Sequence, residues 1–459
     1  MPKKISRRQF IHFGASTLAS AGMLSTMGGL QRALAATTDV TGYKALVCVF
    51  LFGGNSSFNW VVPTSTAAYN TYKSSRSNLA LAQNSLLPLN GTASDGNTYG
   101  LHPSCTELRT LFNATNAAVI ANVGTLVRPA TAPQARGGLV PLPPQLFSHS
   151  DQQTLWQTSI ADSAERYGWA GRIADLLVDQ GVMPNLATNI NVGGANYLQE
   201  GRRSIPYVLG ADGAPVMNAT DNGSYRNGAR RNAVLQLLNQ AATDENILVR
   251  EFASIQQNAS DKVSFVNSAF SAAGTLTTQF PSFAGDSNLG RQLQQVARAI
   301  KARSHLGDSR QIFFVSHGGY DTHNAELGTQ QELLNQLSKN LSAFYSALTE
   351  MGVQNNVTLF TASDFGRSLG SNGDGSDHGW GGHAMVMGGA VRGGRFYGTM
   401  PSLAVNGPDD VGSGRIIPTT STDQYAATLA RWFGVQDSDL DVVFPNLKNF
   451  SARDLGFLT

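Results

Sequence analysis

The fold is decided by Tyr43-Lys44-Ala45-Leu46-Val47-Cys48-Val49-Phe50-Leu51-Phe52, a stretch that ends at Gly53-Gly54. A near-continuous apolar run of this length is typical of a strand buried on both faces, as in the middle of a parallel sheet. Further short strands are predicted at 117–122, 189–192, 311–315, 357–361 and 384–387. Helical patterns lie between several of them, at 105–112, 168–180, 230–259, 289–303 and 327–351. Strands that alternate with helices predict a layered α/β fold with a mainly parallel sheet.

The segment from about 194 to 288 differs from the rest of the chain. It has little strand character and is rich in Gln, Asn and Ser within a helical pattern. We interpret it as a helical insertion on the sheet domain and not as a separate catalytic unit.

The N-terminus has the features of a twin-arginine export signal. Arg7 and Arg8 are followed by a modest apolar stretch at 13–30, and the small residues at 33–36 fit an A-x-A cleavage site. We therefore expect residues 1–35 to be a signal peptide and residues 36–459 to be a mature periplasmic or extracellular domain. No later run approaches the roughly 20 apolar residues of a spanning helix, so no transmembrane segment is expected in the mature chain.

Removal of this signal changes the charge of the protein. The chain has 33 Lys and Arg residues against 31 Asp and Glu residues. Five of the basic residues and none of the acidic ones lie in residues 1–35, which leaves 28 against 31 and a net charge of −3. This balance gives no indication of a nucleic-acid-binding surface.

The chain has two cysteines, Cys48 and Cys105. Because Cys48 lies inside the first predicted strand, core packing is favoured over a disulfide. Two isolated cysteines without a neighbouring ligand are also a poor metal site.

Polar residues collect where the predicted strands end. Such stretches follow three of the strands, at 53–59, 316–323 and 362–367, and a fourth at 377–383 leads into the next apolar segment. The carboxyl ends of parallel strands meet at one edge of a sheet, where ligand sites form. We therefore expect these four loops to gather in one crevice.

These loops supply the oxygen and nitrogen ligands that zinc, manganese or iron accepts, namely Asp321, His323, Asp364, His378 and His383. A metal held by them would stabilise charge on a phosphoryl or sulfuryl oxygen, or activate water as a nucleophile. Each residue taken alone has a plainer explanation, since Asp364 can cap a helix and His383 can be a core histidine. Their origin on separate strand-end loops favours a functional cluster.

A further candidate lies at 146–156, which is predicted to start a helix with Ser148 or Ser150 at its N-cap. A hydroxyl in that position meets free N–H groups and the positive end of the helix dipole, which suits anion binding or an activated nucleophile. A plain cap without chemistry explains the pattern equally well. Arg367 and Arg172 either clamp an anion or form surface ion pairs.

Taken together, these motifs resemble the bacterial domain-of-unknown-function family 1501, a twin-arginine-exported branch of the alkaline phosphatase and sulfatase superfamily. The resemblance covers nearly the whole mature chain and includes GGNSSFNWVVP, LFSHSDQQTLWQT, GGYDTH, TLFTASDFGRSL and SNGDGSDHGWGGHAMVMGG. It implies a three-layer α/β/α sandwich with metal ligands at the strand ends. It also implies a divalent metal (zinc, manganese, magnesium or calcium) and the hydrolysis of phosphate or sulfate esters.

The resemblance assigns roles to individual residues. Asp321 and His323 resemble the ligands of one metal subsite, and Asp364 resembles the later aspartate of the superfamily. The final histidine ligand is matched by His383 or His378. The remaining assignments are Asn55 as a further candidate ligand, Ser148 as the best match to the nucleophile, and Arg367 as a catalytic residue.

Two positions depart from the family pattern. The usual GGND appears here as Gly53-Gly54-Asn55-Ser56, so Ser56 stands where an acid is expected. Phe365 follows Asp364 at a position where phosphatases commonly place a metal-binding histidine. A hydroxyl is a weaker ligand than a carboxylate, which weakens one metal subsite.

Three hypotheses follow for the function. The first is an exported metal-dependent hydrolase that acts on a small anionic ester or an envelope polymer. The alternative is a catalytically weak or inactive envelope protein of the same fold that binds a protein partner or serves in assembly, as Ser56, Phe365 and the polar insertion suggest. A redox enzyme comes last, because the sequence has no G-x-G-x-x-G after the first strand and no cysteine cluster.

Overall fold

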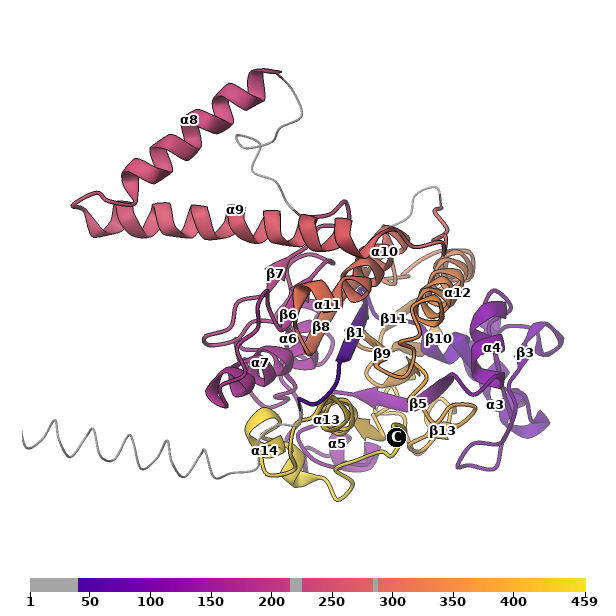
Figure 1. Ribbon diagram of the computed structural model, residues 1–459. Helices are drawn as coiled ribbons and strands as arrows, with labels where there is room; N and C mark the ends of the chain where they lie inside the picture. The colour runs from indigo at the N-terminus through magenta and orange to yellow at the C-terminus, as the bar shows by residue number, and fades with distance from the viewer. Residues whose placement is uncertain (1–39, 215–224, 284–287) are drawn as a thin grey trace, which may run out of the picture.

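The apolar run at 43–52 forms strand β1 (Lys44–Leu51) near the middle of a nine-stranded sheet (Figure 1). The structure is a computed structural model that describes residues 40–214, 225–283 and 288–459. The predicted signal peptide at 1–35 lies outside the described residues. Within the described ranges, no helix combines the length and the apolar character needed to cross a bilayer.

The strand order of the main sheet is β13-β5-β12-β9-β1-β8-β6-β7, with β14 beside β5. β1 pairs in parallel with both of its neighbours, β8 (Arg310–His317) and β9 (Val357–Ser363). β12 (Gly382–Met387) runs antiparallel to β9 and to β5 (Ala117–Gly124). The sheet is therefore mainly parallel, as predicted. Its shorter strands are β6 (Asn189–Asn191), β7 (Tyr207–Val208), β13 (Phe396–Tyr397) and β14 (Thr420–Ser421).

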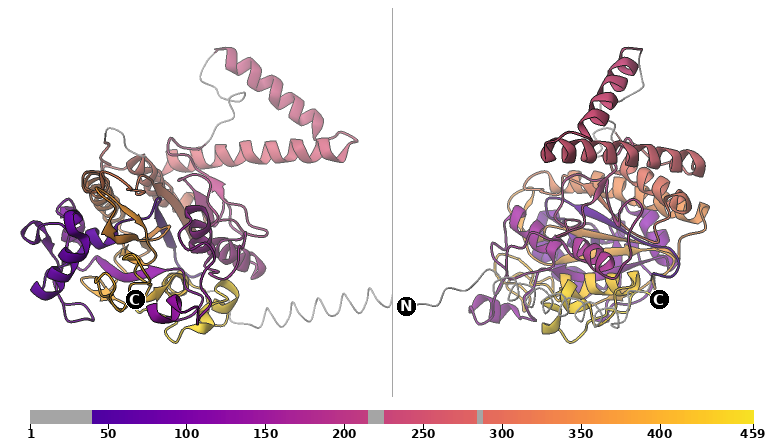
Figure 2. Two further views of the ribbon diagram at one scale, coloured as in Figure 1. Left: turned by 180° about the vertical axis from the view of Figure 1, so that it is seen from behind. Right: turned by 60° about the vertical axis from the view of Figure 1, so that its left-hand side comes forward.

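Helices cover both faces of the sheet because β1 sends alternate side chains into two cores, with Val47 on one side and Cys48 on the other. The first core is closed by α4 (Thr106–Asn113), α10 (Leu289–Lys301), α12 (Glu326–Glu350) and the C-terminal part of α9 (Ile247–Ala273). The second is closed by α6 (His149–Thr158), α7 (Trp169–Asp179), α13 (Thr422–Phe433) and α14 (Leu440–Val443). This arrangement confirms the three-layer α/β/α sandwich (Figure 2). Cys48 and Cys105 are both buried and free.

The remaining elements are small sheets, further helices and short turns outside the main sheet and its two helical layers. Two small sheets contain β2 (Val61–Pro63), β3 (Leu87–Pro88) and β4 (Tyr99–Leu101), and β10 (Arg367–Ser371) with β11 (Ser376–His378). The remaining α-helices are α2 (Ser57–Trp60), α3 (Thr66–Arg76), α5 (Ala132–Arg136), α8 (Tyr225–Ala241) and α11 (Arg303–Leu306). Short 3-10 turns lie at Ser77–Leu79, Gln83–Ser85 and Leu447–Asn449.

The predicted insertion at 194–288 is not helical throughout, because β7 adds a short strand to the edge of the sheet. The single helix predicted at 230–259 is also wrong. α8 and α9 are separate helices, and the side chain of Asn246 accepts a hydrogen bond from the backbone N–H of Leu248 at the start of α9. The polar turn at 242–246 therefore interrupts a helical pattern that the residue spacing alone would continue.

A buried ion pair fixes α12 against α3. The side chains of Arg76 and Glu326 are 1% and 0% exposed. The hydroxyl of Ser56 donates to Glu326 Oε1 over 2.7 Å, and the hydroxyl of Ser376 donates to Glu326 Oε2. This one carboxylate therefore connects the loop after β1 with α3, α12 and β11.

We expect Glu326→Ala to lower the free energy of unfolding by about 3–5 kcal/mol, because it leaves the Arg76 guanidinium buried without its counter-charge. The measurement is urea unfolding followed by circular dichroism. The control is Arg203→Ala, which breaks the exposed pair with Asp179 and should cost at most about 1 kcal/mol. Equal effects of the two substitutions would contradict the structural importance of the buried pair.

The loops after β1 and β8 approach each other at Gly53, whose φ is +115°. A Cβ atom at this position would lie 2.3 Å from the backbone nitrogen of Asp321. We expect Gly53→Ala to destabilise the fold by at least about 2 kcal/mol in the same unfolding assay. Gly318→Ala is the matched control in the β8 loop, since a Cβ there meets nothing within 4 Å. A tolerated Gly53→Ala would show that the two loops are not held in close contact.

Candidate metal centre

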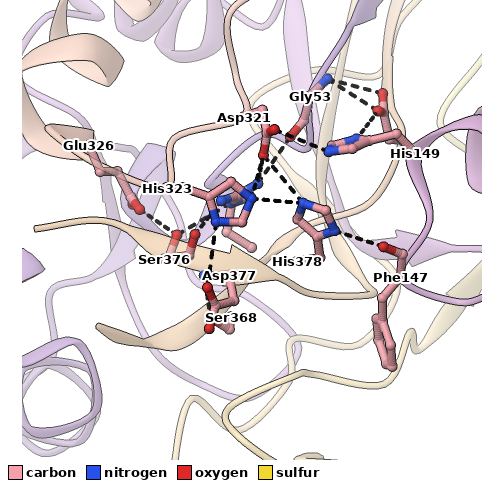
Figure 3. A network of polar contacts seen from close by, with 12 residues as sticks. Gly53, Phe147, His149, Asp321, His323, Glu326, Ser368, Ser376, Asp377 and His378 are labelled. Atoms are coloured by element: carbon pink, nitrogen blue, oxygen red, sulfur yellow. Dashed lines mark hydrogen bonds and ion pairs between the residues drawn. The ribbon is translucent and has the colours of Figure 1, made fainter. Parts of the chain in front are cut away.

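Five segments meet at one edge of the main sheet. The loops after β1, β8 and β9 arrive from three adjacent parallel strands. Because β12 is antiparallel, the residues just before it reach the same edge, and α6 brings its first turn to this place. Figure 3 shows the imidazoles of His149, His323 and His378 around Asp321, with the backbone of Gly53 close by.

Asp364, directly after β9, is the buried anchor of the cluster. Its carboxylate accepts the backbone N–H of Gly53, with 3.2 Å to each oxygen. Oδ2 also lies 2.7 Å from His149 Nδ1 and accepts from Gln153 Nε2 over 2.8 Å. Asp364 is 1% exposed, so these donors replace the water that the carboxylate loses. The contacts fix the imidazole of His149 relative to the ends of β1 and β9.

Asp321, in the loop after β8, is the half-exposed carboxylate at the centre. Its Oδ1 accepts from Arg367 Nη1 over 2.6 Å, and the Arg367 side chain is fully buried. Partial burial on its own raises the pKa of Asp321, but the hydrogen bond and charge of Arg367, with His149 and His323, hold this pKa below its ordinary value. Asp321 is therefore an ionised carboxylate that faces the surrounding imidazoles.

The hydrogen bonds of His149 and His378 determine which ring nitrogen carries a proton. His149 Nδ1 faces the Asp364 carboxylate, and His378 Nδ1 lies 2.7 Å from the carbonyl oxygen of Phe147. Both partners only accept hydrogen bonds, so Nδ1 is the protonated nitrogen in each neutral ring. The Nε2 atoms, which carry the lone pair, then lie 3.4 Å (His149) and 3.3 Å (His378) from the carboxylate oxygens of Asp321. Two unprotonated imidazole nitrogens thus lie close to one carboxylate.

The two rings differ in proton affinity. The hydrogen bond to Asp364 raises the pKa of His149, against the opposing effect of burial and with help from the charges of Asp364 and Asp321. Burial lowers the pKa of His378, and repulsion by His149 and Arg367 adds to this effect although the Phe147 carbonyl opposes it. A neutral His378 is therefore available as a ligand at neutral pH.

His323 and Asp377 form the outer rim of the cluster. His323 Nε2 lies 3.0 Å from Asp321 Oδ1 and 2.9 Å from His378 Nε2, so one N–H is shared between two acceptors. His323 Nδ1 lies 3.5 Å from Asp377 Oδ1. Both rim side chains are about half exposed, which leaves this side of the cluster open to solvent.

The donor set suits a divalent cation. One ligand atom each from His149, Asp321 and His378 lies within 4.8 Å of the others. Among the residues that the structure describes, His149 Nε2 has no hydrogen-bond partner although it is buried. Metal-binding histidines typically donate their second nitrogen to a carboxylate or a backbone carbonyl, as both rings do here. Nitrogen and oxygen donors of this kind suit zinc or manganese.

The structure brings together Asp321, His323 and His378, with Asp364 and Arg367 directly behind them. It places three other candidates differently. His383 is buried beside Phe58, its Nδ1 accepts the N–H of Asn122, and burial lowers its pKa to about 3. This pattern is that of a neutral core histidine.

Within the described residues, neither the Asn55 amide nor the Ser148 hydroxyl is hydrogen-bonded to His149, Asp321 or His378. Asn55 is 2% exposed, and neither atom of its amide has a hydrogen-bond partner within the described part of the chain. It lines a small internal cavity together with His383. Ser148 is the N-cap residue of α6, but its hydroxyl contacts Asp151 and Ser150 instead of a backbone N–H.

The structure gives a role to each of the two residues that depart from the family pattern, Ser56 and Phe365. Ser56 is buried and bonded to Glu326, so it belongs to the ion-pair network and not to the cluster around Asp321. The ring of Phe365 lies 4.8 Å from the rings of His149 and His378, measured between centroids. Phe365 therefore supports the imidazoles by packing against them.

His149 is the ligand candidate that the sequence reasoning missed. The sequence does not single it out, because His149 starts a helix instead of ending a strand and is flanked by the candidate hydroxyls of Ser148 and Ser150. Its place directly beside Ser148 is the signal that the sequence offers for it.

One family model and several solved structures are similar to this chain. A family model described as "Protein of unknown function (DUF1501)" matches residues 43–444. No curated protein matches the sequence. A sulfatase from Pseudoalteromonas sp. is 10% identical, with 86% of this chain and 68% of that chain covered and a TM-score of 0.35. A protein in the alkaline phosphatase superfamily from Vibrio parahaemolyticus is 11% identical, with 87% and 69% covered and a TM-score of 0.37.

A third solved structure, the phosphonate monoester hydrolase of Agrobacterium radiobacter, is 10% identical. The match covers 86% of this chain and 74% of that chain, with a TM-score of 0.32. The family match spans most of the sequence and includes every strand-end loop of the cluster. The protein therefore belongs to the DUF1501 family.

Proposed function

We propose that the protein is an exported metal-dependent hydrolase of phosphate or sulfate esters. The observation that carries the proposal is the approach of the Nε2 atoms of His149 and His378 to the carboxylate of Asp321. Nitrogen and oxygen donors that face one another in this way form a site for a cation. A bound divalent metal would neutralise charge that develops on a phosphoryl or sulfuryl oxygen.

The residues around the cation site have separate tasks. Asp364 and the Phe147 carbonyl orient the two imidazoles. Arg367 holds Asp321 in place from the buried side. The half-exposed rim at His323 is the side from which an ester can approach. These residues would bind the metal and orient its ligands. The position of the ester relative to them sets the direction from which the nucleophile attacks.

Ser148 is our proposed nucleophile. It directly precedes His149 at the N-terminus of the ten-residue helix α6. Its hydroxyl donates to Oδ2 of Asp151, a carboxylate that can accept the proton as Ser148 bonds to phosphorus or sulfur and the ester bond to the departing alcohol breaks. Water would then displace Ser148 and release phosphate or sulfate. The first turn of α6 also offers free backbone N–H groups to an anionic substrate.

A binding role without turnover is the second candidate function. It is favoured by Ser56, which offers no carboxylate, and by Phe365, which offers no ligand atom. In this case the cluster would hold a metal or an anionic envelope polymer without cleaving it. The experiment below separates the two functions.

We expect the mature protein to contain bound metal by elemental analysis and to hydrolyse p-nitrophenyl phosphate or p-nitrophenyl sulfate. His149→Ala and His378→Ala should each lose the metal and reduce turnover at least about 100-fold, because each removes a ligand. Asp364→Asn should weaken metal affinity about 10–100-fold by releasing His149. His305→Ala, at an exposed position on α11, is the control and should retain both properties.

Three results would count against this proposal. Metal retained in both histidine variants would rule out the proposed ligands. A wild-type protein without metal after incubation with zinc, manganese and calcium, and without turnover, would favour the binding role. Metal binding without turnover of either ester would also favour the binding role and would leave the cation site intact.

We also propose that residues 1–35 direct export through the twin-arginine pathway. Arg7→Lys combined with Arg8→Lys keeps the charge but changes the residues that the pathway reads, so we expect uncleaved precursor to accumulate in the cytoplasm. Cell fractionation with immunoblotting measures this. Lys3→Arg with Lys4→Arg is the charge-matched control and should be exported. Normal processing of the Arg7 and Arg8 variant would contradict the assignment.

A further inference from the structure

The helices α8 and α9 form an arm that projects from the sandwich (Figures 1 and 2). α9 has 27 residues, a length of about 40 Å, and only its C-terminal part packs into the first core, through Val266, Ala269 and Phe270. Lys262 Nζ donates to the carbonyl oxygen of Leu186 and marks the point where the helix meets the body. The first turns of α9 therefore extend beyond the domain.

An apolar stripe covers this free end of α9. Leu248, Phe252 and Ile255 are 75%, 60% and 62% exposed. Their spacing of four and three residues places them on one face of the helix. Two further exposed apolar residues lie nearby in sequence, Ile247 on α9 and Leu237 on α8. Exposed apolar side chains in a continuous stripe mark an interaction surface, whereas scattered ones are ordinary.

The charge of the arm limits the kind of partner. Over residues 225–273, the five basic residues Arg226, Arg230, Arg231, Arg250 and Lys262 are nearly balanced by the four acidic residues Asp244, Glu245, Glu251 and Asp261, which leaves a net charge of +1. A balanced surface lacks the basic excess that nucleic acid or an anionic membrane surface requires. A net charge of +1 gives only weak, salt-screened repulsion between two such arms, so a second copy of this chain is an electrostatically compatible partner.

We propose that the stripe on α9 is a dimerisation surface that pairs with the same stripe of a second copy. In an antiparallel pair around a two-fold axis, Leu248 faces Ile255 of the other copy and Phe252 lies near the axis. The exposed apolar area is on the order of 500 Å² per copy, so pairing buries about 1,000 Å², the lower bound for a specific interface. The arm holds this surface away from the body, and the two sandwiches do not need to touch. This inference does not rest on the proposed hydrolase activity.

The test is sedimentation velocity of the mature protein between about 0.1 and 100 μM. We expect a reversible monomer–dimer equilibrium in the wild type. Leu248→Glu with Phe252→Glu should weaken self-association about 100-fold or more, since each change buries a charge at the centre of the interface. Leu139→Glu alters a side chain that is 75% exposed elsewhere on the surface and should leave the equilibrium unchanged.

A second measurement fixes the location of the interface. Phe252→Cys should give a disulfide-linked dimer under mild oxidation, while Leu139→Cys should not, and both native cysteines are buried. A wild type that stays monomeric up to 100 μM would overturn the proposal. So would a dimer that survives the double glutamate substitution with an unchanged dissociation constant.

Discussion

The buried carboxylate of Asp364 joins three segments that are far apart in sequence. It accepts hydrogen bonds from the end of β1 at Gly53 and from His149 and Gln153 on α6, while its own backbone continues β9. The parallel register that pairs Leu51 with Ser363 brings Gly53 within reach. A buried anion without these donors would be costly, so the strand register and the position of α6 depend on each other through one side chain. The cluster around Asp321 is built on this arrangement.

Much of the sheet could be predicted from the sequence because its central strands are buried on both faces. The run around Val47 is apolar at nearly every position, and the strands around Phe313 and Phe360 have short apolar cores and are buried along almost their whole length. The same reasoning placed Asp321 and His378 in one cluster, because strand ends share an edge. This rule depends only on chain direction, which is why it works without knowledge of side-chain contacts.

Other features depended on contacts that the sequence does not reveal. His149 reaches the site from a helix start, and only the bond to Asp364 gives it a fixed role. His383 follows the same loop as His378, yet it begins the buried strand β12, where desolvation leaves it neutral beside Phe58. The break between α8 and α9 is set by Asn246, the N-cap residue of α9. In the sequence, this capping signal is weaker than the helical periodicity on either side of it.

The departures at Ser56 and Phe365 are consistent with the rest of the cluster. The hydroxyl of Ser56 lies 2.7 Å from Glu326, and a carboxylate at position 56 would place two anions in contact beside one Arg76. The acidic group thus lies on α12 in this chain and is neutralised in the core. Phe365 contributes no ligand but packs against the imidazoles of His149 and His378. Neither position supplies a metal-ligand atom, so the converging donors of this edge are those of His149, Asp321 and His378.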